Sequence, residues 1–360
     1  MNQQRIHANI LLLVIAALSS CSEPSGIKVG PPARLDIVSG DVQSAIVGTE
    51  LGQPLVARIL DANGNAVVGQ IVNFRVTKGN GSVFAGSGLT NANGIVQERW
   101  TLGTSTAESQ VVEARAVDSN TGAPLVFGAF SAIALPGPVA SAAVNAGDGQ
   151  EAEIGTAVSI PPSVKVMDSY GNPVPNVAVT FSVALGGGAI TGATPKTDAA
   201  GIAAVGSWTL ALGMVAGDNL LSTTVSGLTG SPVSFAAYAR PGPATTMAMA
   251  GGNNQSQRFG LSVCVPPYVK VTDAYGNGVS GGVPPRVTVT FAVTSGGGTI
   301  VGHEAVTSDN QLGKGIAQVG DWRPGPGIGT KNTLSASVPG LNGSPVTFTA
   351  TTVDSEIECP

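Results

Sequence analysis

The chain has 360 residues, including 50 glycines and 24 prolines, and a formal charge of −5 from 17 basic and 22 acidic side chains. The length suits two or three domains. An apolar fraction of 42% without a collagen period excludes disordered and fibrous classes. The acidic balance argues against nucleic acid or an anionic membrane face as a partner. With 11% charged and 4% aromatic residues, the composition favours an all-β protein rich in turns.

The N-terminal segment has the pattern of a secretory signal peptide. A polar start carrying Arg5 precedes an apolar run over residues 10–18, which is too short for a stable transmembrane helix. The sequence Leu18-Ser19-Ser20-Cys21 resembles the lipobox of bacterial lipoproteins. That resemblance implies that Cys21 is lipidated and becomes the mature N-terminus. The alternative is an ordinary signal peptide followed by a chance cysteine.

The rest of the chain repeats one unit three times, at a spacing of about 105–114 residues. A period this long corresponds to a whole domain and not to a solenoid repeat. In each unit a D-x-x-G-N turn, a V-[NT]-F strand, a glycine turn, a tryptophan and a closing strand follow in that order. These landmarks lie at 61–65, 168–172 and 273–277; 72–74, 179–181 and 289–291; 79–81, 186–188 and 296–298; Trp100, Trp208 and Trp322; and 124–127, 231–235 and 344–348.

Each unit shows the alternation of strands. In the third unit, residues 287–293 alternate β-branched apolar and small residues, as a strand with one buried face does. Seven short strands between turn signals predict an immunoglobulin-like (Ig-like) sandwich, with the tryptophan of each unit as a core anchor. The predicted strands of the third unit are 244–250, 261–272, 286–294, 299–307, 315–322, 332–338 and 346–353.

The repeated motifs resemble a known family. The D-x-x-G-N turn, the V-T-F strand, the G-G-G turn, T-[DN]-x-x-G at 90–94 and 197–201, and the closing P-V-x-F strand are similar to bacterial immunoglobulin-like domains of group 1. These are the tandem modules of invasin- and intimin-type surface proteins. The resemblance covers nearly all of residues 33–353 and implies the fold, but it transfers no binding residue because the motif residues are structural. The third unit departs from the pattern at 278–285 and 308–313.

We expect three tandem Ig-like domains in an elongated array. Proline-rich linkers at 135–138 and 240–243 limit bending between them. With Cys21 lipidated, the first domain is nearest the membrane and the C-terminal end of the third domain is the free tip. The expected boundaries are signal peptide 1–20, tether 21–32, domains 33–135, 138–240 and 243–354, and tail 355–360.

Two further cysteines remain in the exported chain. Cys264 is expected early in the second strand of the third unit, and Cys359 follows its last strand. Both positions fall at the same end of a sandwich, so we predict a disulfide. It would contribute roughly 3–4 kcal/mol in the chain-entropy model. Two free thiols are the alternative.

Candidate catalytic residues are scarce. His303 is the single histidine after the signal peptide, and its neighbour Glu304 would point to the opposite face of a strand. We find no G-x-S-x-G elbow, phosphate loop or Cys/His cluster in the sequence, so we expect no enzyme activity, no cofactor and no metal. The recurrent Asp61, Asp168 and Asp273 leave calcium open, but one carboxylate per loop favours an Asx-type turn.

The leading hypothesis is a non-enzymatic, lipid-anchored envelope protein, a stalk of Ig-like modules for adhesion or surface presentation. Ser22 gives no clear inner-membrane retention signal, which favours the outer membrane. The alternatives are a carbohydrate-binding protein that uses Tyr170, Tyr275 and Phe259, or a subunit of a larger assembly joined through edge strands.

The C-terminal end of the third unit is the expected binding surface for a protein or glycan ligand. Its loops at 251–259 and 323–328 depart most from the repeat. Loops on a rigid sandwich commonly carry recognition, and Arg258, Phe259 and Arg323 are residue types found at interface centres. The alternative is that a terminal module diverges only to cap itself.

Overall fold

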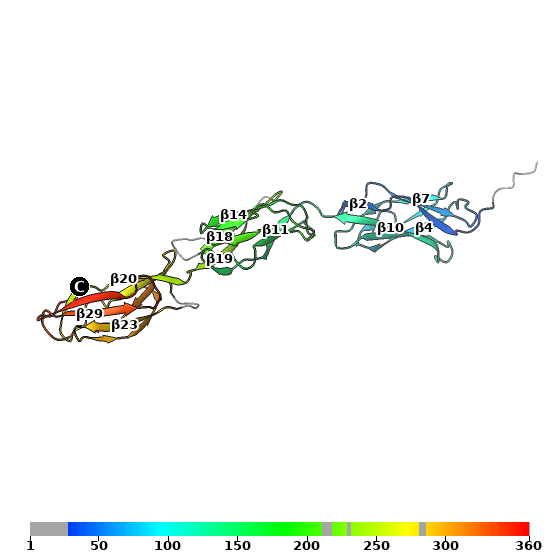
Figure 1. The fold of residues 1–360 in the computed structure, drawn as a ribbon. Helices are drawn as coiled ribbons and strands as arrows, with labels where there is room; N and C mark the ends of the chain where they lie inside the picture. The colour runs from blue at the N-terminus through cyan, green and yellow to red at the C-terminus, as the bar shows by residue number, and fades with distance from the viewer. Residues whose placement is uncertain (1–27, 211–217, 229–231, 281–285, 360) are drawn as a thin grey trace, which may run out of the picture. The chain divides into compact units, whose positions relative to one another are not determined.

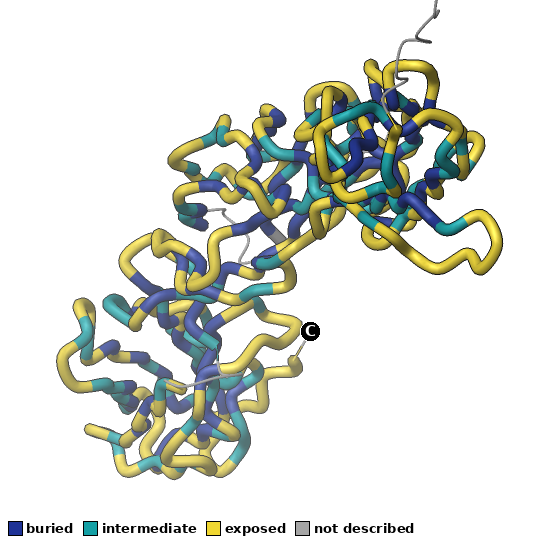
Figure 2. Tube along the Cα trace, turned by 90° about the vertical axis from the view of Figure 1, so that its right-hand side faces the viewer, coloured by how far each residue is buried: buried dark blue, intermediate teal, exposed yellow. Residues whose placement is uncertain are grey.

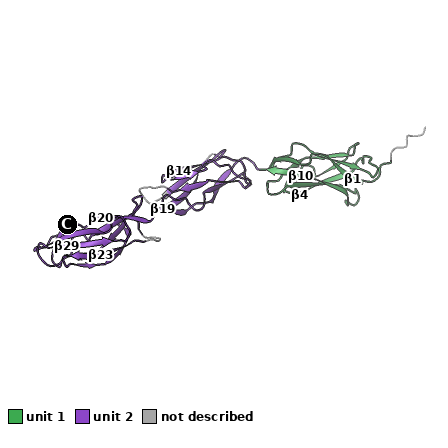
Figure 3. Ribbon diagram, in the orientation of Figure 1, with its two compact units in different colours: residues 1–135 green, residues 136–360 purple. Residues whose placement is uncertain are grey.

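The computed structural model describes residues 28–210, 218–228, 232–280 and 286–359. Contacts divide the chain into two compact units, residues 1–135 and residues 136–360 (Figure 3). The elements assigned in the described ranges are all strands, so the all-β prediction is confirmed (Figure 1). One hydrophobic core lies in the first unit and two lie in the second. The sandwiches that enclose these cores are called the first, second and third domain.

The first domain pairs a three-stranded sheet with a five-stranded sheet. Their orders are β1-β3-β7 and β2-β10-β9-β4-β6, and β5 forms a separate ribbon with β8. The strands are β1 (Arg34–Ser39), β2 (Gln43–Ile46), β3 (Leu55–Leu60), β4 (Ile71–Lys78), β5 (Ser82–Val83), β6 (Ser87–Leu89), β7 (Ile95–Glu98), β8 (Trp100–Thr101), β9 (Gln110–Val117) and β10 (Pro124–Leu135).

The second domain has the same plan in its described residues. Its sheets have the orders β11-β13-β16 and β12-β19-β18-β14, with a ribbon of β15 and β17. The strands are β11 (Ser141–Ala146), β12 (Gln150–Glu153), β13 (Ser163–Met167), β14 (Val179–Leu185), β15 (Ala189–Thr191), β16 (Ile202–Ala204), β17 (Ser207–Thr209), β18 (Asp218–Val225) and β19 (Val233–Arg240).

The third domain has one strand more in each sheet than the second domain. The orders are β20-β22-β27-β26 and β21-β30-β29-β23-β25, with a ribbon of β24 and β28. The strands are β20 (Ala244–Gly251), β21 (Gln255–Arg258), β22 (Tyr268–Asp273), β23 (Thr288–Ser295), β24 (Thr299–Val301), β25 (Glu304–Val306), β26 (Ser308–Asn310), β27 (Gly313–Gln318), β28 (Asp321–Arg323), β29 (Lys331–Ser337) and β30 (Val346–Val353).

In every domain the first strand consists of two halves that belong to different sheets. The first half pairs antiparallel in the smaller sheet, and the second half pairs in parallel with the last strand: β2 with β10, β12 with β19 and β21 with β30. Gly40, Gly147 and Gly252 separate the halves in the left-handed backbone region. A side chain there would collide with main-chain atoms of the loop before the next strand, so the switch between sheets requires glycine.

Large aromatic side chains fill the three cores, and buried and exposed residues alternate along the strands (Figure 2). Burial of these rings removes much apolar area from water and contributes strongly to stability. The prediction that the tryptophans are core anchors is confirmed. The buried aromatic residues are Phe74, Trp100 and Phe130 in the first domain; Phe181, Trp208 and Phe235 in the second; and Phe291, Trp322 and Phe348 in the third.

One match between the repeats is wrong. The sequence pattern equates Phe127 with Phe235 and Phe348, but Phe127 is 69% exposed. The equivalent residue is Phe130, which is buried and lies two residues before the parallel pairing begins, as the other two phenylalanines do. The mismatch arises because β10 begins several residues earlier than its counterparts.

Predicted strands 244–250 and 346–353 match β20 and β30 closely. The prediction at 261–272 is wrong at its start, because β22 begins only at Tyr268. Pro266 and Pro267 have no N–H to donate to a ladder. Cys264 therefore lies in the loop before β22 and not in a strand.

Two predicted strands are divided in the structure. The segment 299–307 forms β24 and β25, because Gly302 between them adopts a left-handed conformation. The segment 315–322 forms β27 and β28, since the chain moves there from the four-stranded sheet to the ribbon.

Candidate functional site

One end of the third domain carries the three residues predicted for ligand binding. β21 and β30 run in parallel to this end, where Arg258 pairs with Val353. β28 pairs with β24 so that Arg323 lies opposite Thr299, directly after the glycine turn at 296–298. That turn follows β23, which pairs with β29 and through it with β30. The register therefore places Arg258, Phe259 and Arg323 at the same end of the sandwich.

The three side chains differ in their surroundings. Phe259 is 58% exposed, and Arg258 is also exposed. The Nε of Arg323 donates to the Asp321 carboxylate at 2.9 Å, in an ion pair at the surface. Such exposed pairs are weak and exchange readily, so Arg323 can also bind a ligand.

The C-terminal tail is fastened to the same end. Cys264 and Cys359 form the predicted disulfide, with their Cα atoms 5.1 Å apart. Buried Gln257 adds hydrogen bonds, since its carboxamide donates to the carbonyls of Ser262 and Ile357 and accepts the N–H of Ile357. The tail thus holds the loop between β21 and β22 from two sides.

The recurrent aspartates form turns. Each accepts the main-chain N–H groups two and four residues later, in the arrangement of an Asx turn. Each also accepts the N–H of a glycine 31 residues earlier, in the segment that leads into its own domain. The turn interpretation is therefore confirmed. The glycine–aspartate pairs are Gly30 and Asp61, Gly137 and Asp168, and Gly242 and Asp273.

These hydrogen bonds favour the ionised carboxylate in two of the domains. The N–H of Gly30, followed by the Asn65 side chain, lowers the pKa of Asp61 from 3.8 to about 2. Burial raises the pKa of Asp168, but hydrogen bonds from Asn172 and Gly137 outweigh it, so this pKa lies below its ordinary value.

We expect the Asp61→Asn variant to be less stable than the natural chain at pH 7. A carboxylate whose pKa is lowered on folding contributes its full stabilisation above about pH 4, and the contribution is lost between pH 4 and 2. The difference in melting temperature between the two chains should therefore shrink over that range. Calorimetry of the first domain's transition at pH 7, 4 and 2.5 measures it.

Comparison with the natural chain isolates Asp61, because Asp118 in the same domain also has a lowered pKa and is present in both proteins. A difference in melting temperature that stays constant from pH 7 to 2.5 would show that the charge of Asp61 does not stabilise the fold.

The aromatic residues considered for carbohydrate binding lie apart. Tyr170 and Tyr275 are exposed in the aspartate turns of the second and third domains. Phe259 lies at the opposite end of the third domain from Tyr275, because β22 runs between the loops that carry them. The third domain therefore does not bring its two residues into one platform.

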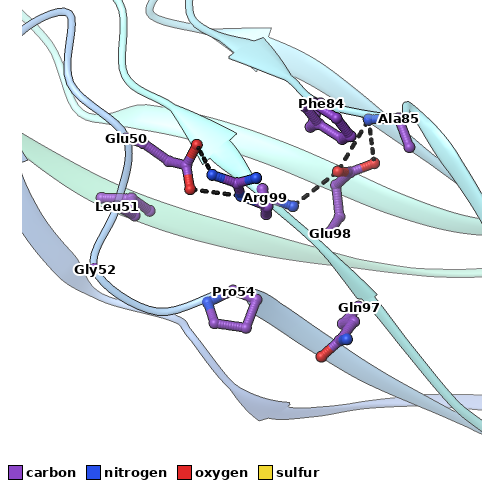
Figure 4. A pocket seen from close by; sticks show the side chains of 9 residues that line it. All are labelled: Glu50, Leu51, Gly52, Pro54, Phe84, Ala85, Gln97, Glu98 and Arg99. Carbon is purple, nitrogen blue, oxygen red and sulfur yellow. Dashed lines mark hydrogen bonds and ion pairs between the residues drawn. The ribbon is translucent and has the colours of Figure 1, made fainter.

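The first domain contains a hollow of about 340 Å³ that no sequence motif indicated. Leu51, Pro54 and Phe84 give it apolar walls, and Gln97 and Arg99 lie on the strand segment beside it (Figure 4). Figure 4 shows the Arg99 guanidinium between the carboxylate of Glu50 and the ring of Phe84.

Hydrogen bonds and stacking fix this arrangement. Arg99 donates from Nε and Nη2 to the two oxygens of Glu50, at 2.6 and 2.8 Å. The Cζ of Arg99 lies 5.3 Å from the centre of the Phe84 ring, which is a cation–π contact. The ring of Phe84 is nevertheless 79% exposed.

A buried carboxylate supports the wall of the hollow. Glu98 is 4% exposed, and its carboxylate accepts main-chain N–H groups from Ala85, Gly86 and Arg99. It thereby joins β7 to the turn between β5 and β6. Sequence spacing gave no signal for Glu98, because Glu98 is two residues before Trp100 and the residues two before Trp208 and Trp322 are Gly206 and Gly320.

Other chemistry has little support in the described residues. His303 is exposed between β24 and β25, and Glu304 begins the second of these strands. Within the described ranges, His, Cys, Asp and Glu side chains do not form a group of three that could hold a metal ion. The same part of the chain contains no helix that could span a membrane.

No protein-family model and no curated protein matches the sequence. Among solved structures, a chain of the FdeC adhesin of Escherichia coli is similar over 89% of this chain and 99% of the solved chain, with 16% identity and a TM-score of 0.55. The chain shares the tandem Ig-like fold of these adhesin domains. At this identity the likeness concerns the fold alone.

Two further structures fit less well. Invasin, a bacterial integrin-binding protein, matches over 89% of this chain and 79% of its own, with 14% identity and a TM-score of 0.36. The D0–D1 domains of intimin match over 55% of this chain and 94% of their own, with 24% identity and a TM-score of 0.21. The expected resemblance to bacterial Ig-like adhesin modules is confirmed at the level of fold by the FdeC structure, and these two matches add no argument to it.

Proposed function

We propose that the protein is a non-enzymatic component of the cell envelope that presents Ig-like domains for adhesion. The observation that carries the proposal is the similarity in fold to the FdeC adhesin, which spans nearly the whole of both chains. The scarcity of catalytic side chains in the sequence supports a role in binding.

In this proposal Cys21 carries the lipid anchor, with the outer membrane as its favoured location. Cys21 lies outside the described residues, and its support is the lipobox-like sequence that ends in it. The three domains then form a stalk, in which the proline-containing linkers limit bending.

The proposed binding surface is the end of the third domain that carries Arg258, Phe259 and Arg323. Two features support it: the aromatic ring is exposed, and the disulfide restrains the loop after β21. The expected departure of 251–259 from the repeat is wrong, because Gly252 and β21 correspond to Gly40 and β2 in the first domain and to Gly147 and β12 in the second. A restrained loop loses less conformational freedom when it binds a partner. The ligand class is a protein or a glycan on another cell.

Replacing Arg258, Phe259 and Arg323 together by alanine should reduce binding of the purified protein to target cells at least tenfold. The melting temperature should change by no more than about 2 °C, because the three side chains lie at the surface. Cell-binding titrations by flow cytometry, together with calorimetry, measure both quantities.

The matched control is the Tyr275→Ala, Arg286→Ala double variant, which removes exposed side chains from the opposite end of the same domain. It should bind cells like the natural protein. Undiminished binding by the triple variant, or equal losses in both variants, would place the binding surface elsewhere.

A further inference from the structure

The hollow in the first domain carries polar side chains that are exposed and do not pack in the core. Glu50, Phe84 and Arg99 are largely at the surface, yet their side chains are held in one arrangement by two hydrogen bonds and a stacking contact. Ordered, exposed side chains beside an apolar wall are typical of a preformed ligand site. The structural role nearby belongs to Glu98, which is buried.

The strand register shows that this cluster is specific to the first domain. Val83, Ile190 and Ile300 each pair with the core tryptophan of their domain, and the main-chain N–H groups of Leu51, Val158 and Val263 each bond to its carbonyl. The residues next to these paired residues in the sequence therefore occupy equivalent positions in the three domains. The residues at the positions of Glu50, Phe84 and Arg99 are Ala157, Thr191 and Ser207 in the second domain, and Ser262, Val301 and Asp321 in the third.

The charges around the hollow disfavour ionic ligands. The place of a cation on the Phe84 ring is already taken by Arg99. An anion would meet Arg99 only in competition with Glu50, and Glu98 nearby adds a second negative charge. The hollow therefore suits an uncharged ligand, which can contact its apolar walls and the hydrogen-bonding atoms that have no partner in the Arg99–Glu50 pair.

The hollow offers both hydrogen-bond donors and hydrogen-bond acceptors to a ligand. The bonds from Arg99 to Glu50 use Nε and Nη2, which leaves the Nη1 N–H groups as donors. The Glu50 oxygens each retain a lone pair, and the exposed Gln97 carboxamide offers a donor and an acceptor. Adjacent donors and acceptors beside an apolar surface suit a ring that carries hydroxyl groups on its edge and C–H groups on its face.

We propose that the hollow of the first domain binds a neutral saccharide. A volume of about 340 Å³ lies near the lower limit of small-molecule pockets, about 300 Å³, so the ligand is one or two sugar rings and not a long chain. This site is separate from the proposed adhesive end of the third domain, and it adds a second recognition surface to the protein.

The test uses the chain from residue 22 onward and an array of neutral, acidic and amino mono- to tetrasaccharides, followed by calorimetric titration of the sugars that bind. We expect neutral sugars to bind. Phe84→Ala and Gln97→Ala should each weaken binding at least fivefold, and both residues are exposed, so the fold should be preserved.

Val301→Ala is the matched control, because Val301 is the exposed equivalent of Phe84 in the third domain. It should leave the affinity for these neutral sugars unchanged, as should the triple variant at Arg258, Phe259 and Arg323. A glycan that binds the adhesive end would lose affinity in the triple variant and not in Phe84→Ala, which separates the two sites. Absence of saccharide binding, a preference for acidic or amino sugars, or affinity that survives Phe84→Ala and Gln97→Ala would each overturn the proposal.

Discussion

Replacing Cys264 and Cys359 by serine is expected to lower the free energy of unfolding of the third domain by about 4 kcal/mol. The disulfide joins residues 95 positions apart, so its loss frees a long loop in the unfolded chain. Without it, the tail retains only hydrogen bonds such as those of Gln257. Denaturant titration followed by hydrogen exchange, with peptides assigned to each domain, measures the change.

The first and second domains provide an internal control, because the disulfide lies entirely in the third. Their exchange midpoints should not move. A third-domain midpoint that is equal in the oxidised natural chain and in the double serine variant would show that the bond adds no stability, and that the domain's own core suffices.

Glu98→Ala is expected to destabilise the first domain by about 3 kcal/mol. The carboxylate accepts N–H groups from Ala85, Gly86 and Arg99, and its removal leaves donors unpaired beside a cavity. Hydrogen bonds to a charged group contribute about 1.5–3 kcal/mol each, and a buried unpaired donor costs about 1–3 kcal/mol. Hydrogen exchange of peptides that cover β5 and β6 should increase first.

Two further variants test whether the buried hydrogen bonds of Glu98 cause the loss of stability in Glu98→Ala. Glu98→Gln keeps one acceptor oxygen and should lose less stability than Glu98→Ala. Glu50→Ala removes an exposed carboxylate from the same hollow and should cost less than about 1 kcal/mol. If Glu50→Ala proved as damaging as Glu98→Ala, the hydrogen bonds of Glu98 would not be what holds the turn.

The fold class could be predicted from the sequence because each repeat contains the same core residues and the same turns in the same order. Trp100, Trp208 and Trp322 mark equivalent core positions, and the aspartate turns mark equivalent loops. Strand β21 was missed, because Gln255-Ser256-Gln257-Arg258 lacks apolar alternation and joins its sheet through main-chain pairing with β30. The alternation of apolar side chains does not predict a strand that is held in its sheet by main-chain hydrogen bonds alone.

The candidate sites were predictable only in part. The disulfide followed from topology, since both cysteines fall at one end of a sandwich. The hollow of the first domain did not, because Glu50, Phe84 and Arg99 are far apart in sequence and each resembles an ordinary surface residue. Glu98 shows the same limit, because a charged residue in a strand is expected to face water until the structure shows which groups surround it.

The parallel pairing of the first and last strands has a mechanical consequence. In the first domain the chain passes through β1 into β2 and leaves through β10, and β2 and β10 run in the same direction; β11, β12 and β19 repeat this in the second. Tension along the chain pulls such strands past each other, so it loads all the bonds between them at once and does not open them one by one. A pulling force on the chain would therefore be resisted in each of these two domains by all the hydrogen bonds of a short ladder together.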